Sequence, residues 1–404
     1  MRKSSLATSN PLITHLGDFP RGDALTKILF RRAEYGINER THSKEDRIGY
    51  LSRLSSTFYP RPEYLRYSML FDRLVRAGYE PRRNLIEGNG PSLCERSPGI
   101  VYNTAKTLPI DGSCLLLAGA TGSGKTYITK LICAQYPEYI DHGQITKGRI
   151  QLVQIPVLYV RCPSNGSLIS LGRAFFLALD ERLQLHGFYS KRAEKTSAST
   201  EDLSQAMSQA CKTHAIGALV FDEFQDLMDA SHKSSRGIIN FLLSLRDTIK
   251  VPIVYVGTFP MLSLFGNDGR SARRSAAGGA VLIARFPSHD DEIWMAMCDA
   301  YWAAQWTKKP SKLTPQLRKL IYSLSQGIPD YFHQVFVRAQ ELAIESGHER
   351  LDEDTLQDAF DYRCQALHTT VAALAKGTRS EIHAFRDLSH PWVEPVPRRA
   401  RGTK

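Results

Sequence analysis

Short apolar runs alternate with amphipathic stretches through the middle of the chain. The apolar runs are rich in Val, Ile and Leu, and they occur at 114–119, 154–162, 218–223, 251–258 and 280–286. Between them, apolar residues recur at helical spacing at 125–135, 168–183, 201–214 and 236–249. Strands that are apolar along their whole length and alternate with helices are typical of a parallel sheet covered on both faces. We therefore predict an α/β unit with a five-stranded parallel sheet.

The flanking segments have different patterns. Residues 1–50 lack sustained periodicity, which predicts a partly ordered arm, and a helix over 64–78 ends at Gly78. Turn signals over 84–110 indicate a loop, and four helical patterns follow residue 290. The predicted domains are a basic N-terminal arm, a helical extension, the α/β unit, a helical unit and a basic C-terminal tail, at 1–60, 61–110, 111–289, 290–376 and 377–404.

The bulk composition is that of a globular protein without a membrane span. The 404 residues are 42% hydrophobic and 23% charged, and no apolar run approaches the ~20 residues that a bilayer requires. The seven cysteines are scattered and never spaced as CxxC. This pattern favours a reducing cytoplasm and argues against a structural zinc site.

The net charge of +11 is concentrated at the two ends of the chain. Residues 1–100 carry 17 Lys/Arg against 11 Asp/Glu, and residues 371–404 carry 7 against 3. The 270 residues between them carry 28 against 27, and are close to neutral. Basic arms of this kind either are simply solvated or contact a polyanion, and DNA is the simplest polyanionic partner.

A complete phosphate-loop motif follows the first predicted strand. The pattern G-x-x-x-x-G-K-[ST] is filled by Gly119, Ala120, Thr121, Gly122, Ser123, Gly124, Lys125 and Thr126. Glycines allow backbone N–H groups to surround phosphates, and the following helix adds positive potential at its N-terminus. We expect Lys125 to reach the β- and γ-phosphates of ATP and Thr126 to bind Mg²⁺.

Two adjacent carboxylates end the third predicted strand. The run Leu219-Val220-Phe221 leads to Asp222 and Glu223 at the edge of the sheet where the phosphate loop begins. Asp222 is expected to hold the Mg²⁺ water shell, and Glu223 to orient and deprotonate an attacking water. The pair indicates hydrolysis rather than transfer to an acceptor.

Polar residues beyond the next strand complete the candidate site. Thr258 is either an ordinary end to its strand or a hydroxyl that faces the γ-phosphate or the attacking water. The loop "GRSARRSAAGG" contains Arg270, Arg273 and Arg274, which are either solvated or supply an arginine finger to a neighbouring subunit. We favour the finger, with Arg273 and Arg274 ahead of Arg270. A finger that acts between subunits requires head-to-tail assembly into a ring or a filament.

Together these motifs resemble an AAA+ P-loop NTPase with a small helical lid. Narrower features resemble the TnsC/TniB group, the ATPase regulators of bacterial cut-and-paste transposons. They are "AGYEPRRN", "GATGSGKT", "VFDEFQDL", "VPIVYVGT" and "SQGIPDYF", and the resemblance covers roughly residues 60–345. In this group the phosphate loop and Asp222 bind ATP and Mg²⁺, Glu223 is the hydrolytic base and Thr258 is the first sensor. The basic second sensor of many AAA+ proteins has no counterpart, because Asp330 and Tyr331 follow the turn at Gly327-Ile328-Pro329.

The resemblance also implies partners. It implies a homo-oligomeric ring or filament on double-stranded DNA that bridges a target-selector protein of the TniQ/TnsD type to the transposase. By analogy, DNA contacts are expected on loops at the inner face of the assembly. The candidates are four basic residues and two hydrogen-bonding helpers: Lys147, Arg149, Arg161, Arg173, Asn165 and Ser167.

Two other functions remain open from the sequence. The first is an AAA+ DNA motor or helicase loader, in which hydrolysis moves or loads something on DNA. The second is a signalling ATPase scaffold that binds no DNA and whose arms bind proteins. Salt-dependent DNA binding that requires ATP would exclude the scaffold, and strand separation would identify the motor.

Overall fold

The computed structural model describes residues 10–85, 114–145, 150–191, 200–228, 237, 241, 251–262, 279–376 and 387. The chain divides into two compact units. The first comprises Met1–Pro20, Arg66–Ala118 and Thr126–Val281, and the second comprises Arg21–Leu65, Gly119–Lys125 and Leu282–Lys404. Within the described ranges, no helix is both long and apolar enough to cross a bilayer.

The first unit is organised around a parallel five-stranded sheet in the order β4-β5-β6-β1-β7, which confirms the predicted fold class. The strands are β1 (Cys114–Gly119), β4 (Val157–Arg161), β5 (Ala218–Asp222), β6 (Ile253–Gly257) and β7 (Ala280–Ile283). All five lie within the apolar runs of the sequence. Strands β1, β5 and β6 are buried at every position, because helices cover a parallel sheet of this kind on both faces.

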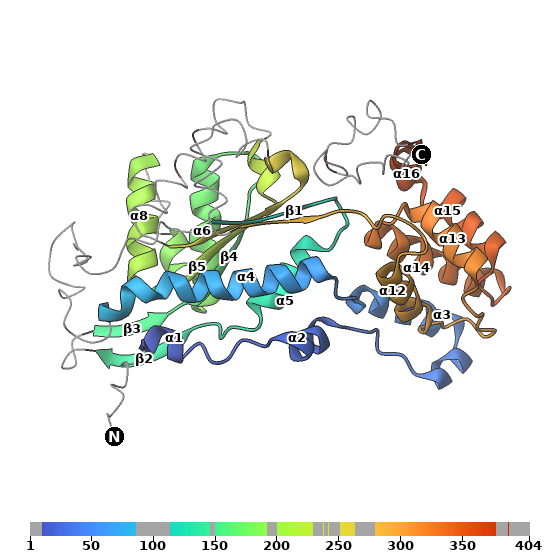
Figure 1. The fold of residues 1–404 in the computed structure, drawn as a ribbon, viewed down its shortest axis with the longest axis horizontal. Coiled ribbons are helices and arrows are strands. Elements are labelled where there is room, and N and C mark those ends of the chain that lie inside the picture. The colour runs from blue at the N-terminus through green and yellow to red at the C-terminus, as the bar shows by residue number, and fades with distance from the viewer. Residues whose placement is uncertain are drawn as a thin grey trace, which may run out of the picture. The chain divides into compact units, whose positions relative to one another are not determined.

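Four longer helices of the described chain pack around this sheet: α4 (Pro62–Tyr79), α5 (Lys125–Cys133), α6 (Leu168–Arg182) and α8 (Thr200–Thr213). Helices α4 and α5 run side by side (Figure 1), and Tyr67 Oη lies 3.2 Å from Thr129 Oγ1 between them. Helix α6 packs against β4 and α8. Gly172 allows α6 close to α8, because a Cβ there would lie 2.3 Å from Leu203 Cδ1. The helix predicted over 236–249 lies outside the described residues, apart from 237 and 241.

Several short elements of the first unit were not predicted from the sequence. An antiparallel hairpin joins β2 (Ile140–Ile145) to β3 (Ile150–Gln154), and its polar first strand gave no apolar run to recognise. The other elements are α1 (Pro11–Thr14), η3 (Glu80–Leu85), η4 (Phe224–Met228) and η5 (Phe259–Met261). Helix α1 is held by Asn10, which caps it at Leu12 N and donates to Tyr79 O at 2.9 Å.

The second unit is helical. Its elements are α2 (Gly22–Leu29), η1 (Ile37–Thr41), α3 (Lys44–Tyr50), η2 (Leu51–Ser56), α12 (Glu292–Trp302), α13 (Pro315–Ser325), α14 (Pro329–Ser346), α15 (Glu353–Arg363) and α16 (Gln365–Lys376). Its core contains Trp294, Trp302, Trp306, Phe332 and Phe336. Five helices follow residue 290 in the described chain, rather than the predicted four. The reason is that only Cys364 separates α15 from α16, so the apolar pattern hardly breaks between them.

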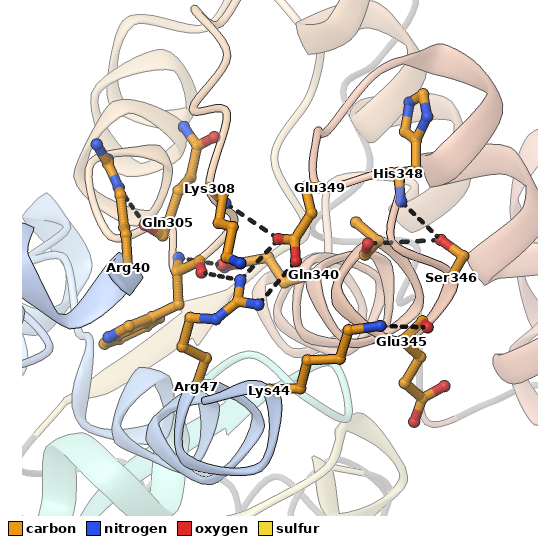
Figure 2. Close-up of polar contacts among 12 residues, drawn as sticks. Arg40, Lys44, Arg47, Gln305, Lys308, Gln340, Glu345, Ser346, His348 and Glu349 are labelled. Atoms are coloured by element: carbon orange, nitrogen blue, oxygen red, sulfur yellow. Dashed lines mark hydrogen bonds and ion pairs between the residues drawn. The ribbon is translucent and has the colours of Figure 1, made fainter. Parts of the chain in front are cut away.

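The N-terminal segment is more ordered than the sequence suggested. Residues 37–56 form η1, α3 and η2, and they pack against the helices that follow residue 290. The Arg47 side chain is fully buried and makes two hydrogen bonds to the Glu349 carboxylate, at 2.6 and 2.7 Å (Figure 2). It also donates to Trp306 O at 3.0 Å. The expectation of a partly ordered arm over 1–50 was therefore wrong for this segment, while the predicted domain boundaries stay predictions.

Candidate functional site

The phosphate loop of the sequence motif connects β1 to α5. Gly122 and Gly124 have positive φ values of 76° and 82°, which residues with a Cβ adopt only at a cost. Ser123, which lies between them, does not have a positive φ. Left-handed residues that alternate with right-handed ones are typical of an anion-binding nest, in which successive N–H groups turn toward one centre. The loop conformation therefore fits a bound phosphate.

Two side chains of the loop are positioned to respond to a ligand. Lys125 is buried, and its Nζ donates to the carbonyl oxygens of Gly119 at 3.1 Å and Ala120 at 2.8 Å. Ser123 Oγ is buried and has no hydrogen-bond partner among the described residues. A buried hydroxyl without a partner is costly, and an incoming oxygen ligand would satisfy it.

Aromatic residues support the loop from one side. Tyr64 Oη donates to Ser123 O at 2.5 Å, and the Phe58 ring stacks on Tyr64 with centroids 5.0 Å apart. A Cβ on Gly124 would lie 3.1 Å from Tyr64 Oη and 3.2 Å from Phe58 Cε2. Burial raises the pKa of Tyr64 to about 12, so its hydroxyl remains a donor at neutral pH. Sequence reasoning missed this support. Phe58 and Tyr64 both lie in "TFYPRPEY", at residues 57–64, well before the phosphate loop in the sequence.

The first turn of α14 contacts the loop from another side. Asp330 N donates to Gly122 O at 3.2 Å. A Cβ on Gly122 would lie only 2.8 Å from Asp330 Cβ and 3.0 Å from Ile328 Cγ2. The Asp330 carboxylate accepts from Gln334 Nε2 at 2.8 Å, and the first turn of α14 contains no Lys or Arg. Arg338, farther along α14, pairs with Glu341 at 2.7 Å on the helix surface.

Asp222 ends β5 as a buried carboxylate, and its exposed fraction is 1%. Its Oδ1 accepts from Glu223 N at 2.8 Å, and its Oδ2 accepts from the Tyr159 hydroxyl on the neighbouring strand β4. Burial, followed by the charge of Asp222, raises the pKa of Tyr159, so this hydroxyl stays protonated. Tyr159 was not singled out from the sequence. The alternation in "VLYVR" could have indicated a half-exposed side chain near the strand end.

Glu223 and Thr258 are linked through a third residue, Gln225. Glu223 has a φ of +54°, and its carboxylate accepts from Gln225 Nε2 at 2.6 Å. Thr258, which is 5% exposed, donates its backbone N–H to Gln225 Oε1 at 2.9 Å. A non-glycine residue in the left-handed region stores strain and is most common at functional sites.

The sheet topology explains why these residues were grouped from the sequence. Strands β5, β6 and β1 are parallel neighbours, so their carboxyl ends lie at one edge. Asp222 ends β5, Thr258 follows β6, and the phosphate loop continues the chain from β1. In open α/β sheets ligands bind at this edge.

The other predicted residues have different outcomes. Arg270, Arg273, Arg274, Lys147 and Arg149 lie outside the described residues. Arg161 and Arg173 are exposed, on β4 and α6.

Asn165 and Ser167 help to begin α6. Ser167 caps the helix at Ser170 N, and Asn165 donates to Ser170 Oγ at 2.8 Å. Neither contact bears on DNA, so the predicted DNA-binding roles stay predictions. Within the described ranges, no group of three or more His, Cys, Asp or Glu side chains could hold a metal ion.

Comparison with known proteins found a matching family model and similar solved structures. A protein-family model described as an AAA domain matches residues 110–264. Among solved structures, a Walker-type ATPase of Pyrococcus abyssi has 14% identity and a TM-score of 0.41, over 67% of this chain and 71% of that one. The Thermotoga maritima RuvB Holliday junction branch migration motor has 14% identity and a TM-score of 0.30, over 62% and 61%. A Drosophila ORC structure bound to DNA has 13% identity and a TM-score of 0.36, over 84% and 86%.

No curated protein matches the chain. The AAA match supports an ATPase, and it agrees with the five-stranded sheet, the phosphate loop after β1 and the helical C-terminal region. The fold is that of the AAA+ P-loop NTPases.

Proposed function

We propose that this chain is an Mg²⁺-dependent ATPase that assembles on duplex DNA and regulates transposition as TnsC/TniB proteins do. The observation that carries the proposal is the shared edge of β1, β5 and β6, from which a phosphate loop, two carboxylates and a threonine emerge. Catalysis of phosphoryl transfer to water depends on holding such groups in position.

In this proposal the phosphates of ATP bind the loop amides, Lys125 and the Ser123 hydroxyl. Thr126 and Asp222 would hold Mg²⁺, which would supply positive charge that stabilises the phosphates. The donor set fits, because Mg²⁺ prefers a few oxygen ligands and keeps several waters. Each carboxylate oxygen of Asp222 has a second lone pair beyond its bond to Glu223 N or Tyr159. Glu223 accepts a proton from the attacking water, and Thr258 orients that water.

DNA binding rests on the basic excess at the two ends of the chain. Three arginines of the N-terminal region are held by contacts within the second unit, where Arg47, Arg53 and Arg61 form ion pairs with Glu349, Glu39 and Glu63. We therefore assign the DNA contacts mainly to the tail 377–404, which carries 6 Lys/Arg against 3 Asp/Glu, and to Lys147, Arg149, Arg161 and Arg173. Arg273 and Arg274 would reach the nucleotide of an adjacent copy, so the active form is a ring or filament.

Nucleotide binding and hydrolysis test the first half of this proposal. Lys125→Ala should abolish binding of a fluorescent ATP analogue, whereas Lys312→Ala, an exposed lysine on the lid, should bind normally. Glu223→Gln should bind ATP but hydrolyse it at least about a hundredfold more slowly. Glu181→Gln, an exposed acid on α6, serves as its control. Hydrolysis by Glu223→Gln at the unmodified rate would refute the assigned base.

Assembly on DNA tests the second half. With ATP or a non-hydrolysable analogue, fluorescence anisotropy of labelled duplex DNA should rise, and the affinity should fall steeply with salt. Electron micrographs should show rings or filaments, and Glu223→Gln should assemble on DNA but persist after ATP addition. DNA binding that ignores nucleotide would refute the gated assembly, and strand separation would identify a motor instead. Stimulation of strand transfer by a transposase tests the role in transposition.

A further inference from the structure

The carboxamide of Gln225 connects the two residues that the proposed hydrolysis places around water. Gln225 lies in η4, immediately beyond the β5 carboxylates, and its Nε2 donates to Glu223 Oε2 at 2.6 Å. Its Oε1 accepts from Thr258 N at 2.9 Å. The two ends of one side chain therefore hold Glu223 and the end of β6 at a fixed separation.

The orientation of this amide is set by its partners. A backbone N–H can only donate, so it must face the oxygen of the carboxamide. Carboxylates accept, so Glu223 must face the nitrogen, and Asp226 Oδ1 lies on the same side at 3.3 Å. Glutamine is the residue type that satisfies both ends. A glutamate would accept from Thr258 but repel Glu223, and an apolar residue would serve neither.

The surrounding backbone is arranged to admit this bridge. A Cβ on Gly257 would lie 2.6 Å from Gln225 Oε1 and 2.9 Å from Met261 Sδ, so a glycine before Thr258 leaves room for the amide. Glu223 adopts its strained φ of +54° at the other end of the bridge. The strain turns Glu223 out of the strand, and the hydrogen bond from Gln225 then restricts the carboxylate to one position.

The groups around Glu223 make this restriction important. Asp222 precedes it, and Asp226 lies on the same turn, where its backbone N–H donates to Glu223 O at 2.9 Å. Both neighbours are acids, and their negative charges repel the Glu223 carboxylate. The neutral amide of Gln225 therefore holds Glu223 in place by a hydrogen bond and does not neutralise the charge of its carboxylate.

We propose that Gln225 is a positioning residue for hydrolysis, which holds the Glu223 carboxylate in register with Thr258. This inference rests on the proposed function, because it assumes that Glu223 acts on water. It predicts that Gln225 affects the rate of the chemical step and leaves nucleotide binding unchanged, since its bonds reach neither the phosphate loop nor Lys125 among the described contacts.

Three substitutions separate positioning from a general structural role. Gln225→Met breaks both bonds at similar side-chain length, and Gln225→Glu keeps the acceptor for Thr258 but loses the donor to Glu223. Gln357→Glu is the matched control, because Gln357 Nε2 also donates to a carboxylate, that of Asp361, on α15 of the other unit. Single-turnover hydrolysis, the dissociation constant of a fluorescent ATP analogue and the melting temperature are measured for each.

We expect both Gln225 variants to hydrolyse ATP about ten- to a hundredfold more slowly, which is the effect of one lost hydrogen bond to a charged group. Their ATP affinity should stay within about twofold, and the control should match the unmodified protein. Unmodified hydrolysis by Gln225→Glu would overturn the inference, because that variant keeps the acceptor for Thr258 N but loses the donor to Glu223 and Asp226 and places a like charge beside them. A parallel loss of ATP affinity would also overturn it in favour of a structural role.

Glu223→Gln distinguishes the two levels of failure. If Glu223→Gln retains hydrolysis, the proposed function fails. If it abolishes hydrolysis while Gln225→Glu and Gln225→Met remain fully active, only the positioning role fails.

Discussion

Arg47 and Glu349 provide a direct test of what holds the N-terminal segment to the helical unit. Arg47 on α3 is completely buried, and Glu349 beyond α14 is 6% exposed. Their bidentate contact at 2.6 and 2.7 Å is joined by bonds from Arg47 to Trp306 O and from Lys308 N to Glu349 Oε2. Glu349→Gln keeps the size of the side chain but turns an amide group toward the guanidinium.

The expected cost follows from burial. Removing one partner of a buried ion pair leaves an uncompensated charge, which costs about 3–5 kcal/mol of unfolding free energy. Glu349→Gln retains one acceptor oxygen, so we expect a loss near the lower end, about 3 kcal/mol. Arg47→Met should cost a similar amount. The double variant buries no charge and should lose about 1–3 kcal/mol less than the sum of the two.

Urea unfolding followed by tryptophan fluorescence measures this unit, because Trp294, Trp302 and Trp306 lie in its core. The control is Glu341→Gln, which weakens the more exposed ion pairs with Arg338 and Arg363 and should cost less than about 1 kcal/mol. A loss for Glu349→Gln no larger than that of the control would refute the reasoning. Strict additivity in the double variant would refute it as well.

The pH dependence of this pair has a definite sign. Burial by itself raises the pKa of Glu349, but the hydrogen bonds and charges of Arg47 and Lys308 outweigh it and lower the pKa below the ordinary 4.5. A carboxyl with a lowered pKa in the folded state contributes its stability above the unfolded value and loses it as the pH falls. The destabilisation by Glu349→Gln should therefore shrink as the pH drops below about 4.5.

Three further predictions concern the phosphate loop and the N-terminal segment. Gly122→Ala should weaken ATP affinity by about tenfold or more, equivalent to ~1.4 kcal/mol, in a fluorescent-nucleotide titration. Gly143→Ala, which also has positive φ but open space around its Cβ, should leave affinity unchanged, and equal effects would contradict the steric reasoning. Tyr64→Phe removes the bond to Ser123 O, worth about 1 kcal/mol, and should weaken ATP binding about fivefold; unaltered binding would count against this support. Burial opposes ionisation of Glu39, but hydrogen bonds from neighbouring donors outweigh it and lower the pKa of Glu39 to about 2. Its ionised form therefore stabilises the folded state above the unfolded pKa, and this contribution is lost as the pH falls. Between pH 5 and 2.5 the urea midpoint of unfolding should fall less in Glu39→Gln than in the unmodified protein.

The sheet and the parts of the site that are contiguous in sequence could be predicted. Strands β1, β5 and β6 are apolar along their length, so their burial on both faces could be predicted from the sequence. A parallel sheet then gathers the strand ends at one edge, which associates Asp222 with the loop after β1. The assignment of roles to Lys125, Glu223 and Thr258 stays a prediction, because no contact with nucleotide tests it.

The contacts that support these residues could not be read in the same way. Tyr64 lies 59 positions from Ser123, and a tyrosine on an amphipathic helix is usually only a core residue. Gln225 stands beside Glu223 in the sequence, but its second bond goes to Thr258, 33 positions away. Such pairings depend on how the chain closes in space, and hydrophobic periodicity carries no information about them. The same holds for Arg47, which looks in the sequence like a solvated arm residue.

The separation of Arg47 from Glu349 has a consequence for biosynthesis. The two residues are 302 positions apart, so α3 cannot acquire its partner until nearly the whole chain has left the ribosome. At roughly 5–20 residues per second, this wait lasts about 15–60 s. During it, the apolar residues Leu51 and Leu54 have no core to enter, whereas β1 to β6 are already available to pair. The nascent chain thus carries an exposed N-terminal segment for most of its synthesis, which is the period in which a chaperone would be needed.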